Sequence, residues 1–225
     1  MKVSSKLIAL ILLFVLATAV PLFSESYPLD KNTVNPFDRL TMQPYNKALS
    51  VASDISVFTT AATSAVMLAL PSNQYFTVGV IYAETVGLTY AMKELLKWAI
   101  PRERPYLYFE GYPEEALKNG DYNKSFCSGH TSVAFSVAAA NTYIFSKYYP
   151  DSKWKVPVIA ASYSLAAMTG ILRVASGEHF ASDVLVGALL GTAIGYGIPA
   201  LHTLFADKNV EASVSPFGLA IKIGL

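Results

Sequence analysis

The stretch DVLVGALLGTAIGYGIPALHTLF, residues 183–205, contains no Glu, Lys or Arg, and its one acidic residue is the first. A helix rises about 1.5 Å per residue, so this stretch reaches roughly 35 Å and can cross the ~30 Å hydrocarbon core of a bilayer. Gly187, Gly191 and Gly195 recur at four-residue spacing along one face of such a helix. This spacing favours close contact with a second helix in lipid.

Four further apolar stretches precede this one. Hydrophobic residues make up 53% of the chain and charged residues 15%, whereas charged residues make up about 25% of a soluble domain. Asp54 and Glu84 lie inside two of the stretches, and each is either functional or a neutral or paired group in a polar bundle interior. We predict an all-α fold, a helical bundle of five to six membrane-spanning helices that includes residues 49–70, 75–92, 131–149 and 156–172.

The two ends of the chain differ from this helical part. Residues 1–24 place two lysines ahead of an apolar run, which is typical of a secretory signal peptide or an uncleaved signal anchor. Three prolines among polar residues predict an irregular or interfacial segment over 25–48. The helical domain then covers 49–206. Apolar residues in the C-terminal tail, 207–225, alternate like a strand, and we expect a disordered or loosely packed tail.

The helix connections predict where the polar loops lie. A short polar link joins stretches 131–149 and 156–172 into a hairpin, so the loop 101–127 and the segment 173–182 fall at one end of the bundle. The lysines of the link predict that it is cytoplasmic, which puts the opposite end outside the cell. We assign the cations between 93 and 104, which lie on the outer side, to ligand binding instead of topology.

The first polar cluster is KWAIPRERP, residues 97–105. Pro101 ends the preceding helix, so Lys97 and Arg104 can converge on one point. Arginine offers a planar fork of donors to phosphate oxygens, and lysine adds a compact charge. An ordinary basic flank of a membrane helix would show the same residues, and the cluster alone leaves both interpretations open.

The second cluster is SFCSGHTS, residues 125–132, in which Ser128, Gly129 and His130 open a helix. Free backbone N–H groups and the helix dipole make such a start an anion site, and glycine allows close approach of a ligand. His130 could donate a proton to a leaving oxygen. Alternatively, Ser128 is only an N-cap and His130 an interfacial side chain.

The third cluster is RVASGEHFASD, residues 173–183. If the helix starts near His179, then His179 and Asp183 are four residues apart on one face, where side chains meet. The carboxylate would then fix the imidazole tautomer and leave the other nitrogen free to attack, while Arg173 would clamp the phosphate. A structural His–Asp pair is the alternative. The third histidine, His202, is incidental.

Together the three clusters resemble the signature of the type 2 phosphatidic acid phosphatase superfamily, which also includes bacterial non-specific acid phosphatases and vanadium-dependent haloperoxidases. The signature reads K-x6-R-P, then P-S-G-H, then S-R-x5-H-x3-D. Two positions depart from it: Cys127 replaces the usual Pro, and Leu172 replaces the usual Ser. Both departures lie beside the reacting residues and put the fine shape of the pocket in doubt.

The resemblance implies a phosphatase that needs no metal or other cofactor. His179 would attack phosphorus to form a phosphohistidine, Asp183 would orient it, and His130 would protonate the leaving alcohol and later activate water. The phosphate oxygens would be held by Lys97, Arg104, Ser128, Gly129 and Arg173. The sequence itself contains no HExxH motif, paired-carboxylate cluster or Cys/His grouping that suggests a metal site.

The expected partners are a lipid or isoprenoid phosphate and the bilayer. The net charge of +1 gives no field that would attract nucleic acid, and the sequence assigns neither a headgroup nor an oligomeric state. We expect a multi-pass protein of the bacterial cell membrane with its active site facing the periplasm or exterior. The alternatives are a soluble periplasmic acid phosphatase, a haloperoxidase, or a non-catalytic membrane protein that binds lipid headgroups.

Overall fold

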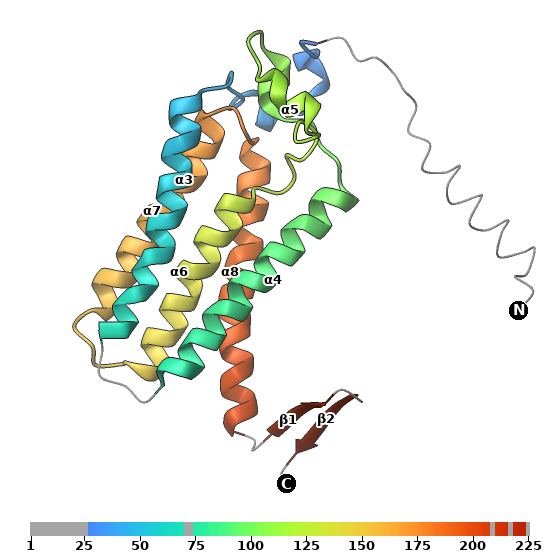
Figure 1. The fold of residues 1–225 in the computed structure, drawn as a ribbon. Helices are drawn as coiled ribbons and strands as arrows, with labels where there is room; N and C mark the ends of the chain where they lie inside the picture. Colours follow the sequence, from blue (N-terminus) through green and yellow to red (C-terminus); the bar gives the residue numbers. More distant parts are fainter. Residues whose placement is uncertain (1–26, 70–73, 208–209, 216–217, 224–225) are drawn as a thin grey trace, which may run out of the picture.

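The structure, a computed structural model, describes residues 27–69, 74–207, 210–215 and 218–223, and it is a bundle of five long helices (Figure 1). The all-α prediction is confirmed, and all five apolar stretches are helical. The predicted leader, residues 1–24, lies outside the described residues. The long helices are α3 (Lys47–Ala62), which continues into the 3₁₀ helix η2 (Thr63–Ala69), α4 (Tyr75–Ala99), α6 (Gly129–Tyr148), α7 (Lys155–Ala175) and α8 (Ala181–Asp207).

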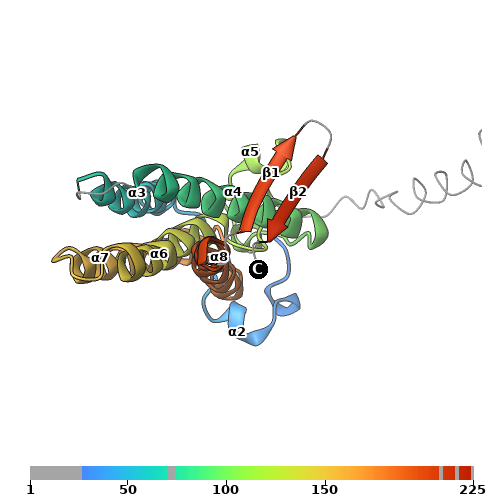
Figure 2. The ribbon, with the colours of Figure 1, turned by 90° about the horizontal axis from the view of Figure 1, so that it is seen from below.

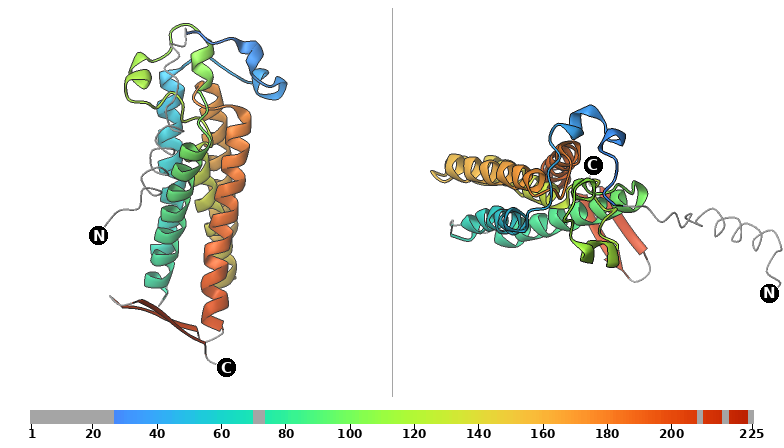
Figure 3. Two further views of the ribbon diagram at one scale, coloured as in Figure 1. Left: turned by 90° about the vertical axis from the view of Figure 1, so that its right-hand side faces the viewer. Right: turned by 90° about the horizontal axis from the view of Figure 1, so that it is seen from above.

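Helix α6 lies at the centre of the bundle and contacts each of the other four long helices. Seen from below, α7, α6 and α8 form one row, and α3 and α4 form a second row beside it (Figure 2). The side view shows α8 running the full length of the bundle (Figure 3). Such a central position requires small side chains, and Ala134, Ala138, Ala139 and Ala140 of α6 are fully buried.

The predicted glycine face of α8 packs directly on the backbone of α6. A Cβ added at Gly191 or Gly195 would lie 2.1 Å from the carbonyl oxygen of Ser132 or Ser136, respectively. At Gly187 a Cβ would lie 2.7 Å from the carbonyl oxygen of Ser128, the N-cap residue of α6. Real Cβ atoms do not approach a backbone oxygen this closely, so the short distance between the two helices is possible only because these residues are glycines.

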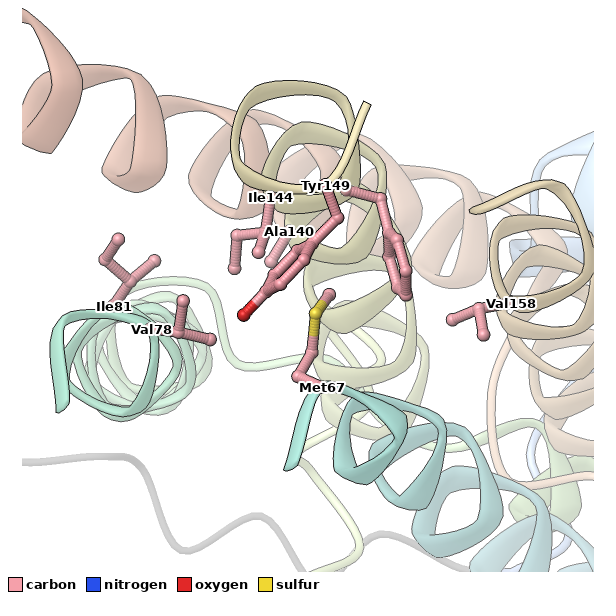
Figure 4. Close-up of a cluster of buried hydrophobic side chains, with 8 residues drawn as sticks. Met67, Val78, Ile81, Ala140, Ile144, Tyr149 and Val158 are labelled. Carbon is pink, nitrogen blue, oxygen red and sulfur yellow. The ribbon is translucent and has the colours of Figure 1, made fainter. Parts of the chain in front are cut away.

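The interior of the bundle combines an apolar cluster with buried polar groups. Asn141 of α6 is fully buried, and its amide donates to Thr63 (2.9 Å) and Ser162 (2.7 Å) while its oxygen accepts from Tyr82. A buried amide is tolerated only when its donors and acceptor are paired. At the end of the bundle away from the polar loops lies an apolar cluster (Figure 4) of Met67, Val78, Ile81, Ala140, Ile144, Phe145, Tyr149 and Val158.

The outward faces of the bundle are apolar. Ile55 and Phe58 of α3, Ile171 of α7, and Leu185 and Leu189 of α8 are all more than half exposed. By length and composition, three described helical segments could cross a membrane: 47–67, 155–175 and 181–205. Apolar side chains on the outside and small or polar ones inside are the arrangement expected of a surface that contacts lipid.

The shorter elements lie at the two ends of the bundle. The segment expected to be irregular contains only η1 (Lys31–Thr33) and α2 (Pro36–Arg39) before α3 begins, and the α4–α6 loop contains η3 (Pro105–Tyr108) and α5 (Glu114–Lys118). At the opposite end, β1 (Val210–Ser215) and β2 (Gly218–Ile223) form an antiparallel hairpin. The alternation in the tail was therefore a strand signal, and the described part of the tail is paired and not disordered.

We expect Gly191→Ala to destabilise the protein, because the new methyl group can fit only if α6 and α8 move apart. Gly197→Ala is the matched control on the same helix, since nothing lies within 4 Å of a Cβ there. Thermal unfolding in detergent should show a clear loss for Gly191→Ala and little change for Gly197→Ala. Equal unfolding temperatures would contradict this account of the helix contact.

Candidate active site

The three polar clusters meet at one end of the bundle, where α5 is labelled in Figure 1. Lys97 lies in the last turn of α4, Gly129 and His130 begin α6, and Arg173 lies in the last turn of α7. His179 lies in the short link between α7 and α8. The prediction that the loop and the link share one end is therefore confirmed.

Backbone hydrogen bonds hold the α4–α6 loop in place. The amide of Arg102 donates to Asn123 (2.9 Å), and the amide of Arg104 donates to Tyr122 (2.8 Å). The amide of Ser125 in turn donates to the carbonyl of Arg102 (2.9 Å). The start of the loop is thus paired with its end, which fixes both Arg104 and the segment that leads into α6.

Two buried arginines form the centre of the site. Arg104 and Arg173 are each 4% exposed, and the same oxygen of Glu178 accepts from both of them, at 3.2 Å from Arg173. Asp121 pairs with Arg104 from the solvent side at 2.8 Å. The Nε of Arg173 is buried and has no hydrogen-bond partner among the described residues. Buried guanidinium groups with an unused donor are suited to binding an anion.

Two lysines add to this positive charge. Burial, together with the nearby charges of Arg104 and Lys93, lowers the pKa of Lys97 to about 8. The side chain of Lys93 passes over Gly129, where a Cβ would lie 2.6 Å from the lysine Cδ. Sequence reasoning assigned Lys93 to ligand binding together with the other cations of this side, but did not include it in the set of phosphate-binding residues. Its four-residue spacing from Lys97 on one helical face was the available signal.

His179 is held as a neutral imidazole. Its Nδ1 lies 2.7 Å from the carbonyl oxygen of Ser125, and because a carbonyl only accepts, Nδ1 carries the proton and Nε2 keeps its lone pair. The ring is 1% exposed. Burial and the charges of Arg173 and Arg104 lower the pKa of His179 well below its usual value. An unprotonated nitrogen in this position is what a nucleophile requires.

Asp183 does not make the direct bond to His179 that the spacing suggested. The nearest oxygen of Asp183 is 3.9 Å from Nδ1 of His179, because α8 begins only at Ala181 and His179 is not on its first turn. Asp183 accepts instead from the hydroxyl of Ser125 (2.6 Å) and the amide of Phe180 (3.0 Å). Its link to the imidazole therefore runs through Ser125, which sequence reasoning missed.

A buried ion-pair network lies behind Asp183. The Arg102 guanidinium bridges Asp183 and Asp38, with a distance of 2.7 Å to Asp38, and stacks on the Phe180 ring at 4.1 Å. Asp38 is fully buried and also accepts from the amide (2.9 Å) and hydroxyl (2.6 Å) of Ser182. Burial alone would raise the pKa of Asp38, but the hydrogen bonds from Ser182 and Arg102 bring it below its ordinary value.

His130 pairs with Asp54, a residue whose role the sequence left open. Its Nε2 lies 2.9 Å from a carboxylate oxygen of Asp54. Burial and the charges of Arg173 and Lys97 lower the pKa of His130 to about 3, so the neutral ring donates its Nε2 proton to Asp54. Glu84, the other charge of uncertain role, is instead 2.6 Å from His202, on helices α4 and α8 away from the site.

Ser128 occupies the N-cap position of α6, but its hydroxyl does not cap the helix. The hydroxyl lies 2.9 Å from that of Thr131, and the amide of Ser128 donates to the carbonyl of Asp183 at 3.1 Å. The start of α6 is thus tied to the start of α8. Within the described ranges, no group of three or more His, Cys, Asp and Glu side chains is arranged to hold a metal ion.

Comparison with known proteins identifies similar sequences. Residues 78–206 match the PAP2 superfamily. The chain is 39% identical over 77 residues to the lipid A 1-phosphatase of Porphyromonas gingivalis, covering 34% of this chain and 16% of that protein. It is 32% identical over 145 residues to the probable diacylglycerol pyrophosphate phosphatase 1 of Schizosaccharomyces pombe, covering 53% of this chain and 50% of that one. The chain thus spans half or less of the length of these relatives.

A solved structure shares the fold. The transmembrane PAP2 type phosphatidylglycerolphosphate phosphatase from Bacillus subtilis superposes with a TM-score of 0.54 at 20% identity. The superposition covers 88% of this chain and 96% of that one. At this level of identity the comparison establishes the likeness of the helical bundle.

We expect Asp38→Asn to lower the stability of the loop end, because Arg102 would keep only one of its two carboxylate partners. Breaking a buried ion pair costs about 3–5 kcal/mol. Thermal unfolding in detergent should show this loss. Asp30→Asn is the control, since Asp30 is an exposed residue that only caps η1, and its substitution should have little effect. Similar unfolding temperatures for both variants would contradict a structural role for the Asp38–Arg102 pair.

Proposed function

The chain belongs to the PAP2 superfamily, and from this premise we propose that it is a membrane phosphatase that hydrolyses a lipid or isoprenoid phosphate through a phosphohistidine. The observation that carries the proposal is the state of His179. A neutral imidazole with Nε2 unprotonated lies beside Arg104 and Arg173, which are buried and positively charged. Phosphoryl transfer depends mainly on such positioning and on charge stabilisation.

In the first step, Lys97, Arg104 and Arg173 hold the substrate phosphate. The Ser128 hydroxyl and the Gly129 amide complete the predicted binding set. Nε2 of His179 attacks phosphorus, and the bond from phosphorus to the leaving oxygen breaks. The proton on Nδ1 of His179 stays on that nitrogen and remains donated to the Ser125 carbonyl, so the positive charge that forms on the ring is stabilised by the carbonyl and, through Ser125, by Asp183.

His130 supplies the proton for the leaving oxygen. In the empty site, cations keep this ring neutral, and a bound phosphate dianion offsets their charge, so His130 takes up a proton together with the substrate. Because Asp54 holds the Nε2 proton, the exchanged proton sits on Nδ1. After transfer to the alcohol, the neutral Nδ1 accepts a proton from water, the hydroxide attacks phosphorus, and the bond to His179 breaks to release inorganic phosphate.

The proposed substrate class follows from the surface of the protein. Apolar side chains cover the outward faces of α3, α7 and α8, and the site lies at the ends of these helices, where a lipid headgroup meets water. These faces favour a membrane enzyme over a soluble acid phosphatase. The names of the two sequence relatives, a lipid A 1-phosphatase and a diacylglycerol pyrophosphate phosphatase, support a lipid phosphate. We further propose a bacterial membrane location with this end facing outward.

We expect His179→Ala to reduce phosphate release by at least about a thousandfold, because the attacking nitrogen is lost. The assay uses detergent-solubilised protein, EDTA, and a panel of phosphatidic acid, phosphatidylglycerol phosphate, isoprenoid pyrophosphate and lipid A. His202→Ala removes a histidine outside the site and should retain activity. Release by His179→Ala at the wild-type rate, or loss of wild-type activity in EDTA, would overturn the proposed mechanism.

The lowered pKa of Lys97, about 8, predicts an alkaline limit. Below pH 8 the ammonium is charged and attracts phosphate, and above pH 8 it loses its proton, so kcat/KM should fall as the pH rises. This ratio reports groups of the free enzyme, and a phosphate monoester is already dianionic in this range. Lys97→Arg keeps a positive charge at all these pH values and should move the fall to higher pH.

The control for this pH profile is Lys118→Arg, which changes an exposed lysine of α5. It should leave the alkaline limit where it is in the wild type. If Lys97→Arg also leaves the limit unchanged, another group sets it, and Lys97 does not act as the titrating cation.

A further inference from the structure

Glu178 occupies an unusual place between the two arginines that are proposed to bind phosphate. One of its oxygens, Oε2, accepts from both Arg104 and Arg173, and the other, Oε1, accepts from the hydroxyl of Ser50 at 3.0 Å. The side chain is 12% exposed. A carboxylate oxygen that bridges two guanidinium groups makes the same kind of contacts that a phosphate oxygen can make.

The burial of the arginines explains why a carboxylate is present there. Two guanidinium groups that are 4% exposed repel each other and have lost most of their hydration, so an empty site without an anion would be strongly unfavourable. Asp121 pairs with Arg104 alone, and its side chain is 44% exposed. Glu178 is the described carboxylate that contacts both arginines within 3.5 Å.

The backbone that carries Glu178 is fixed. Gly177 has φ +74°, and a Cβ there would lie 2.5 Å from the carbonyl oxygen of Gln43. Its own carbonyl accepts from the amide of Tyr106 (3.0 Å), and the carbonyl of Glu178 accepts from Arg104 (3.2 Å). An exchange of anions at this place therefore involves the glutamate side chain, whose other oxygen is already bonded to Ser50, while its backbone stays in position.

We infer that Glu178 is an internal competitor for the phosphate position, which neutralises Arg104 and Arg173 in the empty site and displaces inorganic phosphate after hydrolysis. The inference rests on the proposed function, because it takes these two arginines as the phosphate-binding groups. Phosphate and the carboxylate need the same N–H donors, so each lowers the affinity of the other. Glu178 thereby limits product inhibition and acts on the reaction through the arginines as a positioning residue.

The test is Glu178→Gln, which keeps the shape of the side chain and removes its charge. Inorganic phosphate should bind at least about tenfold more tightly to this variant, because the competing carboxylate is gone. The dissociation constant is measured by the phosphate dependence of the unfolding temperature in detergent, and the inhibition constant is measured against a soluble phosphate monoester. The empty variant should unfold at a lower temperature than the wild type, and phosphate should restore the difference.

Asp121→Asn is the matched control. It removes the same charge from a partner of the same arginine, but Asp121 does not contact Arg173 through any described ion pair. Phosphate affinity should change by no more than about twofold in this variant, since the exposed charge is screened by solvent. A purely structural role for Glu178 would lower the unfolding temperature without tightening phosphate binding, so the two roles give different results.

Tighter phosphate binding by Glu178→Gln than by Asp121→Asn supports the competitor role. Equal or weaker binding by Glu178→Gln overturns it, including the case in which neither the wild type nor the variant binds phosphate. If Glu178→Gln binds phosphate more tightly but neither protein hydrolyses any lipid of the panel, Glu178 still competes with phosphate for the two arginines. In that case the proposed phosphatase function fails and the competitor role does not.

Discussion

The site is organised around positive charge buried at the end of a bundle whose sides face lipid. Arg104 and Arg173 are almost fully enclosed, and burial of an unpaired guanidinium is unfavourable by several kcal/mol. The surrounding residues limit the net positive charge of the site in two ways. Carboxylates such as Glu178 and Asp121 balance the charge, and the histidines remain neutral because a further cation would add to the repulsion. In the proposed mechanism, an incoming phosphate therefore enters a place already shaped for an anion.

Helix contacts far from the reacting atoms hold these charges at fixed positions. The glycine face of α8 packs its backbone against that of α6. At the starts of the two helices, the Ser128 amide also donates a hydrogen bond to the Asp183 carbonyl. A side chain at any of these glycines would separate the two helix starts. The close packing of apolar helices in lipid thus also sets the distance between the two ends that carry His130 and His179.

Sequence patterns predicted the helices and selected candidate site residues that the structure gathers at one end of the bundle, because both leave local signals. Hydropathy marks a spanning helix residue by residue, and spaced cations and histidines mark a phosphate site. Contacts between distant segments leave no such signal. Asp38, which pairs with Arg102, lies in a segment without periodicity. Ser125 acts partly through its backbone carbonyl. The role of Asp54 becomes visible only through its contact with His130. The direct bond between His179 and Asp183 failed as a prediction because it assumed a helix start two residues too early.

The two imidazoles share one positive field but have different surroundings, and this difference assigns their roles in the proposed mechanism. His179 is fully enclosed, its Nδ1 is bonded to a neutral carbonyl, and Asp183 lies 3.9 Å from that nitrogen, so protonation of Nε2 would create a charge with no directly bonded carboxylate. His130 lies next to the carboxylate of Asp54, and its side chain is 36% exposed. When a phosphate dianion offsets the arginines, His130 therefore takes up a proton more readily than His179. One ring remains a nucleophile while the other becomes an acid, as required of a pair of titratable groups that divide one reaction.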